Sequence, residues 1–359
     1  MNKIAELISR LCPDGVEFKT LDSLVSYVQP GPYIVSSTEY DTHYSTPVLT
    51  AGQSFILGYT NEEEGIYNAS SQKPVIIFDD FTTSFHWVDF DFKVKSSALK
   101  ILKIKDKQEA DFRYIYMAMK TIHFIPTNHI RHWISLYSKF EIPLPPLNIQ
   151  KEIVSILDSF TSLIDKMKQE VEMRKKQMEY YLNILICKDN VAARLFGDIG
   201  VVQRGKRVVR KELALQGCIP VFQNSLTPLG YYQYSNIPAN NTFVISAGTA
   251  GEIGFSAKPF WAADDCLVIS SVLCDSKYLY YYLKTQEQFL KSQIRGGAMK
   301  RLSRETIEKL EIPVPSLEKQ RQIASILDSF ETYISKLEKM IELRQKQYEY
   351  YREKLLTFE

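Results

Sequence analysis

The chain has 359 residues, of which 45% are hydrophobic and 24% charged, with 44 Lys and Arg against 42 Asp and Glu. Two domains of ordinary size, each with its own core, fit this length. The formal charge of +2 excludes a strongly basic arm, although basic residues can still gather on one face. No signal-peptide core begins the sequence and it contains no apolar run of about 18 residues, which predicts a cytoplasmic location in a prokaryotic source.

The first 146 residues are predicted to form a mixed α+β domain with a short N-terminal helix. β-Branched runs bounded by turn residues predict strands, as in KPVIIFDDF (73–81) and SALKILKIK (97–105). DFRYIYMAMKT (111–121) has the three-and-four spacing of a helix. The basic residues between Lys93 and Lys107 favour a strand face in solvent.

A long helix is predicted over 147–187. The proline-rich segment IPLPP (142–146) ends the preceding strand, because proline disrupts a helix interior. About 35 residues at 1.5 Å each give roughly 50 Å of helix. Arg174 fills a gap in its apolar stripe, as a polar position of the kind that fixes the register of a coiled coil. The stripe consists of Ile153, Ile156, Phe160, Leu163, Met167, Val171, Met178 and Tyr181.

The second half repeats this order. Residues 188–316 are predicted to form a second α+β domain, in which the tyrosines 280–282 are expected to correspond to residues 114–116. A second long helix is predicted over 317–359, and Arg344 fills the gap in its stripe. This stripe consists of Ile323, Ile326, Phe330, Tyr333, Leu337, Ile341, Tyr348 and Tyr351.

The two helical segments are copies of one sequence. A shift of 170 residues aligns Ile142–Leu185 with Ile312–Leu355 without a gap, and about half of the positions are identical. Two stripes of equal length and phase predict an antiparallel coiled coil with pseudo-two-fold symmetry. In the alternative arrangements, one of the helices pairs with other chains or the coiled coil is homodimeric.

Recognisable catalytic motifs are missing from the sequence. It contains no G-x-x-x-x-G-K-[ST] phosphate loop and no glycine-rich turn for a dinucleotide or S-adenosylmethionine. The Asn-Pro-Pro-aromatic tetrapeptide of amino-methyltransferases does not occur either. His129 and His132 lack further ligands at zinc-like spacing, so no metal site is expected. The sequence therefore predicts a binding protein and not an enzyme.

The chain resembles the specificity (S) subunits of type I restriction–modification systems. The resemblance rests on IPLPPLNIQKEIVSILD and IPVPSLEKQRQIASILD, on the tandem layout and on LCPDGVEFKTL near the start. It implies target recognition domains over 1–146 and 188–316, with conserved spacer helices over 147–187 and 317–359. Such a subunit is non-catalytic, recognises a bipartite, asymmetric DNA sequence, and positions the other subunits of a DNA adenine methyltransferase/endonuclease complex.

The resemblance also implies the partners. Double-stranded DNA, two methyltransferase (M) subunits and motor-nuclease (R) subunits are expected to bind, and no membrane. No cofactor is expected in this chain; S-adenosylmethionine, ATP and magnesium are expected on the partner subunits.

Candidate DNA contacts are basic and amide side chains in loops, because Lys and Arg bind phosphates while Arg, Lys, Asn and Gln reach base edges. The best basic clusters are QRGKRVVRK (203–211) and RGGAMKRLSR (295–304). The candidate residues are Gln29, Gln53, Arg131, His132, Gln203, Arg204, Lys206, Arg207, Asn224, Arg295, Lys300 and Arg301.

Two other functions remain open at this point. The chain could be a non-enzymatic coiled-coil adaptor whose domains bind proteins. It could also be the specificity subunit of a related type II restriction enzyme, in which one partner fuses nuclease and methyltransferase.

Overall fold

The computed structural model describes residues 2–52, 54–126, 130–187, 191–294 and 301–358. The chain forms two compact units: unit 1 contains residues 1–166 and 341–359, and unit 2 contains residues 167–340. Two long helices, α5 (Leu147–Cys187) and α10 (Leu317–Leu356), each contribute one end to each unit. Unit 1 is therefore completed by the C-terminal end of the chain.

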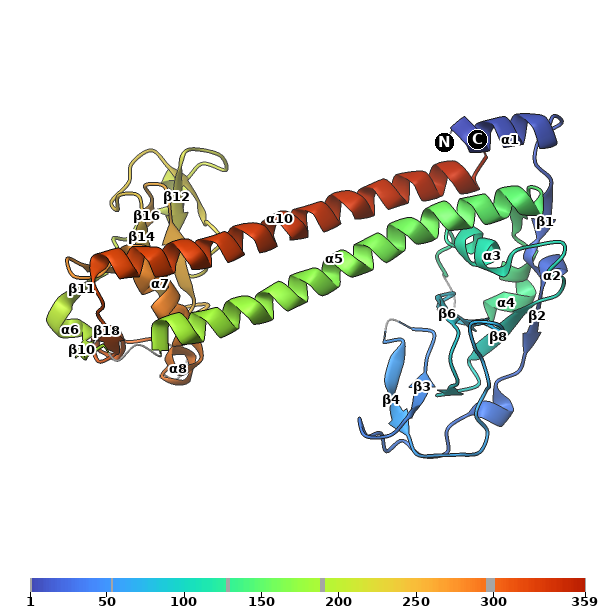
Figure 1. Cartoon of the computed structure of the whole chain (residues 1–359), viewed down its shortest axis with the longest axis horizontal. Helices are drawn as coiled ribbons and strands as arrows, with labels where there is room; N and C mark the ends of the chain where they lie inside the picture. The colour runs from blue at the N-terminus through green and yellow to red at the C-terminus, as the bar shows by residue number, and fades with distance from the viewer. Residues whose placement is uncertain (1, 53, 127–129, 188–190, 295–300, 359) are drawn as a thin grey trace. The chain divides into compact units, whose positions relative to one another are not determined.

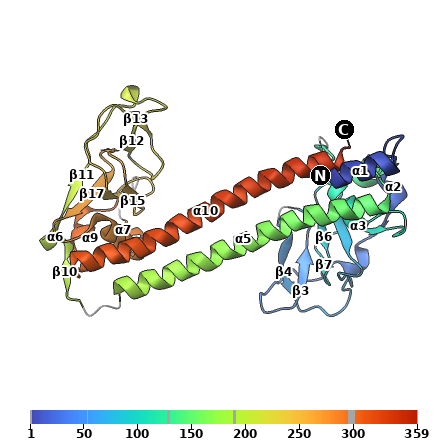
Figure 2. The same cartoon turned by 45° about the horizontal axis from the view of Figure 1, so that its top comes forward.

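Within each unit, α5 and α10 lie side by side (Figures 1 and 2). In unit 1 the rings of Phe160 and Tyr351 lie 5.4 Å apart, centroid to centroid. In unit 2 the rings of Tyr181 and Phe330 lie 5.5 Å apart. The beginning of one helix thus meets the end of the other in both units, which confirms the antiparallel pair.

The packed seam of the pair follows most of the predicted stripe. The positions that are buried or half-buried are Ile153, Ile156, Phe160, Met167, Val171, Met178, Ile323, Phe330, Leu337, Ile341, Tyr348 and Tyr351. The two arginines in the gaps bind along their own helices. Arg174 donates to Glu170 Oε1 and Gln177 Oε1, both at 2.8 Å, and Arg344 donates to Gln347 Oε1 at 2.6 Å.

The seam differs from the prediction where two apolar residues are adjacent. Leu163 is 42% exposed and Ile326 is 44% exposed, whereas their neighbours Ile164 and Leu327 are buried. Both members of such a pair fit a spacing of three or four, and the helical period of 3.6 residues selects the second. Leu163 and Ile326 are therefore replaced in the seam by these neighbours.

Two predicted tyrosines lie at the edge of the seam. Tyr181 is 37% exposed and still contacts Phe330. Tyr333 is 44% exposed, and the guanidinium of Arg174 lies 5.5 Å from its ring centroid. Ile334 takes the buried position beside Tyr333. A phenol at the rim keeps its hydroxyl in water while its ring covers apolar surface.

Unit 1 contains a four-stranded antiparallel sheet and a three-stranded sheet. The order of the larger sheet is β2 (Val25–Val28), β8 (Leu99–Ile104), β5 (Val75–Asp79), β6 (Phe85–Val88). The smaller sheet has the order β4 (Ile56–Thr60), β3 (Thr46–Leu49), β7 (Lys93–Val94). The remaining elements are α1 (Asn2–Leu11), β1 (Phe18–Thr20), α2 (Leu21–Leu24), η1 (Gly31–Tyr33), α3 (Phe112–Met119), α4 (His132–Ser135), η2 (Tyr137–Lys139) and β9 (Glu141–Pro143).

Unit 2 contains the same two sheets. The larger has the order β11 (Gly200–Arg204), β17 (Cys266–Ser271), β14 (Asn241–Ile245), β15 (Ile253–Ser256), and the smaller the order β13 (Gly230–Tyr232), β12 (Ile219–Phe222), β16 (Trp261–Ala262). The remaining elements are β10 (Ala193–Leu195), α6 (Phe196–Ile199), η3 (Arg210–Glu212), α7 (Ser276–Thr285), α8 (Glu287–Ser292), α9 (Arg304–Glu308) and β18 (Glu311–Pro313). The predicted α+β class with paired long helices is confirmed.

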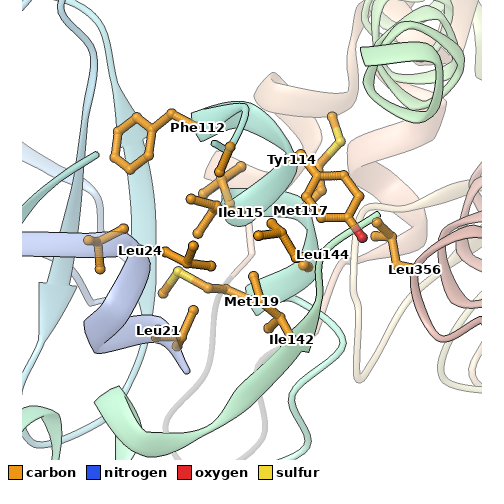
Figure 3. Close-up of a cluster of buried hydrophobic side chains, with 14 of the residues drawn as sticks. Leu21, Leu24, Phe112, Tyr114, Ile115, Met117, Met119, Ile142, Leu144 and Leu356 are labelled. Atoms are coloured by element: carbon orange, nitrogen blue, oxygen red, sulfur yellow. The ribbon is translucent and has the colours of Figure 1, made fainter. Parts of the chain in front are cut away.

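The main core of unit 1 joins the larger sheet to the long helices. Leu21 and Leu24 of α2 pack with the apolar face of α3, and Figure 3 shows Leu356 of α10 beside Tyr114 of α3. Ile4 of α1 belongs to the same cluster. The last turn of the chain is thus buried in the core of the first unit.

A buried glutamine joins each long helix to its unit. Gln150 and Gln320 are both fully buried. The side-chain oxygen of Gln150 accepts from the Asp111 amide at 2.8 Å, while its nitrogen donates to the Pro145 carbonyl at 2.7 Å. Gln320 makes the same bonds at 2.7 and 2.8 Å with Asp275 and the carbonyl of residue 315. The repeated segment of prolines followed by a glutamine therefore serves to join each long helix to its unit.

The same contacts correct the predicted alignment of the tyrosine-rich helices. Asp111 and Asp275 cap α3 and α7, each accepting two backbone amides of its helix. Tyr114 then donates to the Pro143 carbonyl at 2.8 Å, and Tyr278 donates to the Pro313 carbonyl at 3.0 Å. Tyr114 therefore corresponds to Tyr278, and the predicted match with residue 280 is wrong, because a run of tyrosines aligns in several registers.

None of the helices in the described part of the chain is both long enough and apolar enough to cross a membrane.

Candidate nucleic-acid interface

In unit 1 several loops meet where β2 and β5 end and where β8 and α4 begin. Asp80, directly after β5, binds three of these segments. Its amide donates to the Ala98 carbonyl at 2.8 Å, and its own carbonyl accepts from the amide of His132 at 2.8 Å. Its carboxylate accepts from the Trp133 amide at 2.9 Å. Asp80 therefore fixes the position of the first turn of α4.

Lys100, at the start of β8, extends this network to the end of β2. Its side chain and that of Asp80 are each only 1% exposed, and Nζ lies 3.4 Å from Asp80 Oδ2. The ammonium also donates to Gln29 Oε1 at 3.1 Å and lies 5.2 Å from the ring centroid of Tyr27. A buried lysine needs such partners, because an unpaired charge is costly away from water.

The predicted solvated strand face is wrong for two of its lysines. Besides Lys100, Lys93 is buried, 3% exposed, and its Nζ lies 2.9 Å from Glu62 Oε2. Both belong to strands covered on two sides, so they are charges inside the unit and not a surface stripe.

The structure brings together some of the candidate DNA-binding residues of unit 1. Gln29 and Arg131 are exposed. They flank the Asp80–Lys100 pair, since Gln29 binds Lys100 and Arg131 precedes α4. His132 is only 3% exposed, and its ring packs 5.4 Å from that of Phe124. A base contact of the His132 ring is not available in this arrangement, and its backbone instead fixes the loop. Gln53 lies outside the described residues.

Unit 2 builds the corresponding loops with the same backbone hydrogen bonds. The Ser246 amide donates to the Asp265 carbonyl at 2.7 Å, and the Ser246 carbonyl accepts from the Leu302 amide at 2.9 Å. Ser246 thus takes the place of Asp80, and Leu302 that of His132. Arg301, immediately before Leu302, is 41% exposed at its side chain and lies 3.2 Å from Asp265 Oδ1.

A second group of candidates follows the end of β11. Gln203, Arg204, Lys206 and Arg207 are all exposed. Arg204 Nε donates to the Asp264 carbonyl at 2.7 Å. A Cβ at Gly205 would lie 2.1 Å from the carbonyl oxygen of residue 263, so only glycine permits this close approach. The basic segment is therefore held against the Asp264–Asp265 turn.

Asn224 is exposed and lies beside the loop after β14. Its carbonyl accepts from the Thr249 amide at 2.9 Å. Gly248 has a φ of +82°, and a Cβ there would lie 2.4 Å from the Asn224 oxygen. Asn224, Arg204 and Arg301 are thus all tied to the segments that flank Ser246. Arg295 and Lys300 lie outside the described residues.

The family comparison assigns the chain. The profile described as "Type I restriction modification DNA specificity domain" matches twice, over residues 13–173 and 189–345. The chain belongs to the type I restriction modification DNA specificity family. The specificity subunit of the type I restriction enzyme EcoR124I/EcoR124II from Escherichia coli is 36% identical, with 96% of this chain and 95% of that protein covered.

Two further matches are less similar in sequence. A putative type I restriction enzyme specificity subunit of Haemophilus influenzae is 28% identical over 96% of both chains. Among solved structures, the S subunit of a type I restriction–modification system from M. genitalium matches with a TM-score of 0.71. It is 17% identical and covers 95% of this chain and 96% of its own. That likeness shows a shared fold.

Two residues of these candidate loops are not apparent from the sequence. In the sequence, Asp80 is an acidic residue directly after a predicted strand, and Lys100 is a basic residue within a predicted strand. The available signal is phase, because Lys100 shares a strand face with Leu102 and Ile104, which pack in the main core. The main core covers that face, since Leu102 belongs to it and Ile104 packs against it.

The exposed side chains of the two loop groups are guanidinium, ammonium and amide groups. Such groups bind phosphates and base edges. In the residues that the structure describes, no group of three or more His, Cys, Asp or Glu side chains is placed to hold a metal ion. The arrangement of these loops is suited to binding a polyanion.

Proposed function

We propose that the chain is the DNA-recognising subunit of a type I restriction–modification complex, in which each unit reads one half of a bipartite, asymmetric site. One observation supports this most: two equal backbone frameworks hold different polar side chains at the same loops. At the loop end of the first strand of the larger sheet, unit 1 has the exposed Gln29 and unit 2 the exposed Arg204. Beneath these loops, unit 1 buries Asp80 and Lys100 where unit 2 has Ser246 and Leu267. Unlike side chains at equal positions favour two unlike half-sites.

Within each unit, the exposed arginines and amides are proposed to contact bases. Arginine binds guanine O6 and N7 in a bidentate manner, and Asn or Gln pairs similarly with adenine. Gln29 and Arg131 would take these roles in unit 1, and Gln203, Asn224 and Arg301 in unit 2. The basic segment 204–207 would bind phosphates, which adds affinity that falls with salt.

The long helices are proposed to set the distance between the half-sites. α5 has 41 residues, which corresponds to roughly 60 Å of helix. Half-sites one turn of B-DNA apart are separated by about 34–36 Å. The helix is therefore long enough to act as a spacer between two DNA-binding units.

The catalysis is proposed to occur on partner subunits. Methylation of adenine in a duplex requires the base to leave the stack and enter an enzyme pocket. Two methyltransferase subunits would bind S-adenosylmethionine, and motor-nuclease subunits would bind ATP and magnesium. The complex would work in the cytoplasm, where its DNA substrate lies.

The other candidate functions have less support. A protein-binding adaptor and a subunit of a type II enzyme both fit two domains on paired helices. Neither is favoured by a double family match together with 36% identity to a type I specificity subunit over nearly the whole chain.

Methylome sequencing tests the proposal. Cells that co-express the chain with its methyltransferase partner should methylate one split motif with two different halves, and cells with the partner alone should not. Methylation without a split motif would contradict the proposal.

The spacer function has its own test. Deleting one heptad from α5 and the matched heptad from α10 preserves the phase of the seam. It should shorten the spacer by about 3 base pairs, because seven residues span roughly 10 Å. A spacer of unchanged length would contradict this part of the proposal.

A further inference from the structure

A pocket of about 550 Å³ lies in unit 1 between the start of β5, the end of β8 and the first turns of α3 and α5. Aromatic rings of Tyr67, Trp87 and Phe112 form part of its lining. Five basic side chains also line it, namely Lys73, Lys103, Lys107, Arg113 and Lys151, together with one acidic residue, Asp111. The pocket thus combines apolar ring surface with positive charge.

Most of this charge is not neutralised within the unit. The four lysines are exposed, and none forms an ion pair with another described residue. Lys107 Nζ donates to the Gln72 carbonyl at 3.3 Å, and Lys103 Nζ lies 5.3 Å from the ring centroid of Tyr67. Arg113 differs, because its guanidinium lies 2.9 Å from Asp158 Oδ1. Four ammonium groups without an acidic partner among the described residues favour an anionic occupant of the pocket.

The equivalent strand position of unit 2 has no lysine. Lys103 of β8 pairs with Ser26 of β2, and the matching pair of β17 and β11 is Ser270 and Val201. The acid of the pocket does not differ, because Asp111 and Asp275 cap equivalent helices. The lysine at position 103 is therefore a property of unit 1 and not a general consequence of the fold.

The pocket lies at the opposite end of the sheet from the candidate DNA-reading loops. β5 runs from Val75, which lines the pocket, to Asp79, which precedes Asp80. At about 3.3 Å per residue, the strand separates the two sites by roughly 13 Å. β8 runs antiparallel and likewise has Lys103 at the pocket and Lys100 at the loops. The pocket is therefore a separate binding surface of the unit.

The lining places aromatic surface beside its lysines, and a peptide with acidic and apolar side chains fits this combination better than a bare phosphate group. Phosphate sites commonly use free backbone amides at a helix N-terminus. At the start of α3 those amides are already bound, because the Asp111 carboxylate accepts from residues 113 and 114 at 2.8 and 3.1 Å. Lysines on flexible stems pair with carboxylates without fixed geometry, and the half-buried ring of Trp87 offers surface to an apolar side chain. An acidic peptide with an apolar residue matches this combination.

We propose that the pocket binds an acidic segment of the methyltransferase subunit. Its carboxylates contact Lys73, Lys103, Lys107 and Lys151, and one apolar side chain covers the aromatic lining. The inference rests on the proposed function, because it takes the methyltransferase subunit as the partner. Since unit 2 has Ser270 in place of Lys103, this contact distinguishes unit 1 from unit 2.

The test is the association of the full chain with its methyltransferase partner, measured by titration at low and high salt. The double substitution K103E/K107E should weaken association on the order of tenfold at low salt. The loss should shrink as salt is raised, because salt screens exposed charges. The matched control K103R/K107R retains the charge and should bind as the unchanged chain does.

Three results would overturn the inference. Unchanged association of K103E/K107E would remove the pocket from the interface. An equal loss in K103R/K107R would mean that packing and not charge is responsible. A loss of DNA affinity with association intact would make the pocket a phosphate contact. Thermal unfolding of both variants verifies that unit 1 remains folded.

Methylome sequencing separates this inference from the proposed function. If the unchanged complex methylates a split motif while K103E/K107E associates normally, only the pocket assignment fails. If the unchanged complex methylates no split motif, the proposed function fails first.

Discussion

The two units have one backbone framework and two different sets of polar contacts. Their sheets have matching strand order, and both place a backbone amide, of His132 or Leu302, on the carbonyl of the residue after the third strand. Unit 1 then buries an ion pair beneath these loops, whereas unit 2 has a partly exposed pair between Arg301 and Asp265. The backbone hydrogen bonds do not depend on which side chains the loops present.

This difference shows how one fold can present two different loop surfaces. Backbone hydrogen bonds and the buried glutamines fix where the loops lie, and the side chains on those loops can vary with little effect on the sheets. The core positions of each unit are constrained by packing, while exposed positions such as Arg131 and Asn224 are not.

The largest expected effect comes from giving unit 1 the residues of unit 2. Asp80→Ser leaves Lys100 buried without its carboxylate and should lower the free energy of unfolding of unit 1 by about 3–5 kcal/mol. Denaturant unfolding of the full chain measures this loss.

The matched control is the double variant D80S/K100L, which copies Ser246 and Leu267. Because it removes both buried charges, it should recover most of the stability. A cost of Asp80→Ser below about 1 kcal/mol would mean that the pair is not buried in solution.

The next largest effect, the loss of stability when a buried glutamine is removed, should be equal in the two units. Gln150→Ala and Gln320→Ala each remove a buried amide that binds a backbone N–H and a carbonyl. Each should therefore cost about 2–3 kcal/mol, because buried partners are left unsatisfied. Thermal unfolding of the two single variants checks the symmetry, and clearly unequal costs would show that the glutamines support the units differently.

Removing a proposed DNA contact should have a smaller effect, and each removal should affect a different half-site. Arg131→Ala and Arg301→Ala should each weaken DNA binding by about 1–2 kcal/mol and relax base preference in one half-site only. Methylome sequencing of each variant shows which half of the motif changes. The same change in both halves would break the assignment of one unit to one half-site.

The smallest expected effect is on the pH dependence of the stability of unit 1. Burial alone would raise the pKa of Glu62, but Lys93 and the amides of residues 37 and 36 outweigh burial and hold the pKa below its ordinary value of 4.5. A depressed carboxyl pKa contributes stability above the ordinary value, and this contribution is lost as the pH falls through the folded-state pKa. Glu62→Gln should therefore cost on the order of 1 kcal/mol at neutral pH and less at acid pH.

Unit 2 provides the comparison for this effect. Trp261 takes the strand position of Lys93, and its indole donates to a backbone carbonyl at 2.7 Å. The stability of unit 2 at acid pH should not change in the Glu62→Gln variant. A response there would show that the two units unfold as one.

Much of the architecture could be predicted because it is repeated. Two copies of a proline-bounded apolar stripe indicate two long helices of equal phase, and their antiparallel pairing follows from that symmetry. The exact seam could not be predicted, because Leu163 and Ile164 both fit the spacing. The tyrosine register also failed, since only the hydrogen bonds of Tyr114 and Tyr278 distinguish one tyrosine from the next.

The candidate site was predicted less completely for a physical reason. Exposed loop residues such as Gln29, Arg204 and Asn224 are apparent from residue type alone. Burial of a charge depends on what covers it, and Lys100 is covered by loops that are distant in sequence. His132 was misplaced for the same reason, since its ring packs against Phe124.

The division of the chain has a consequence for its synthesis. Unit 1 contains the first 166 residues, but its core also needs Leu355 and Leu356 at the far end of α10. Unit 2 draws on a single continuous stretch, 167–340. The ribosome synthesises the chain from its N-terminus. All residues of unit 2 are therefore available for folding before the last helical turn of unit 1 has been made. The domain that is translated first is therefore the last that can finish folding, and a product that terminates shortly before Leu355 would keep unit 2 and lose the completed core of unit 1.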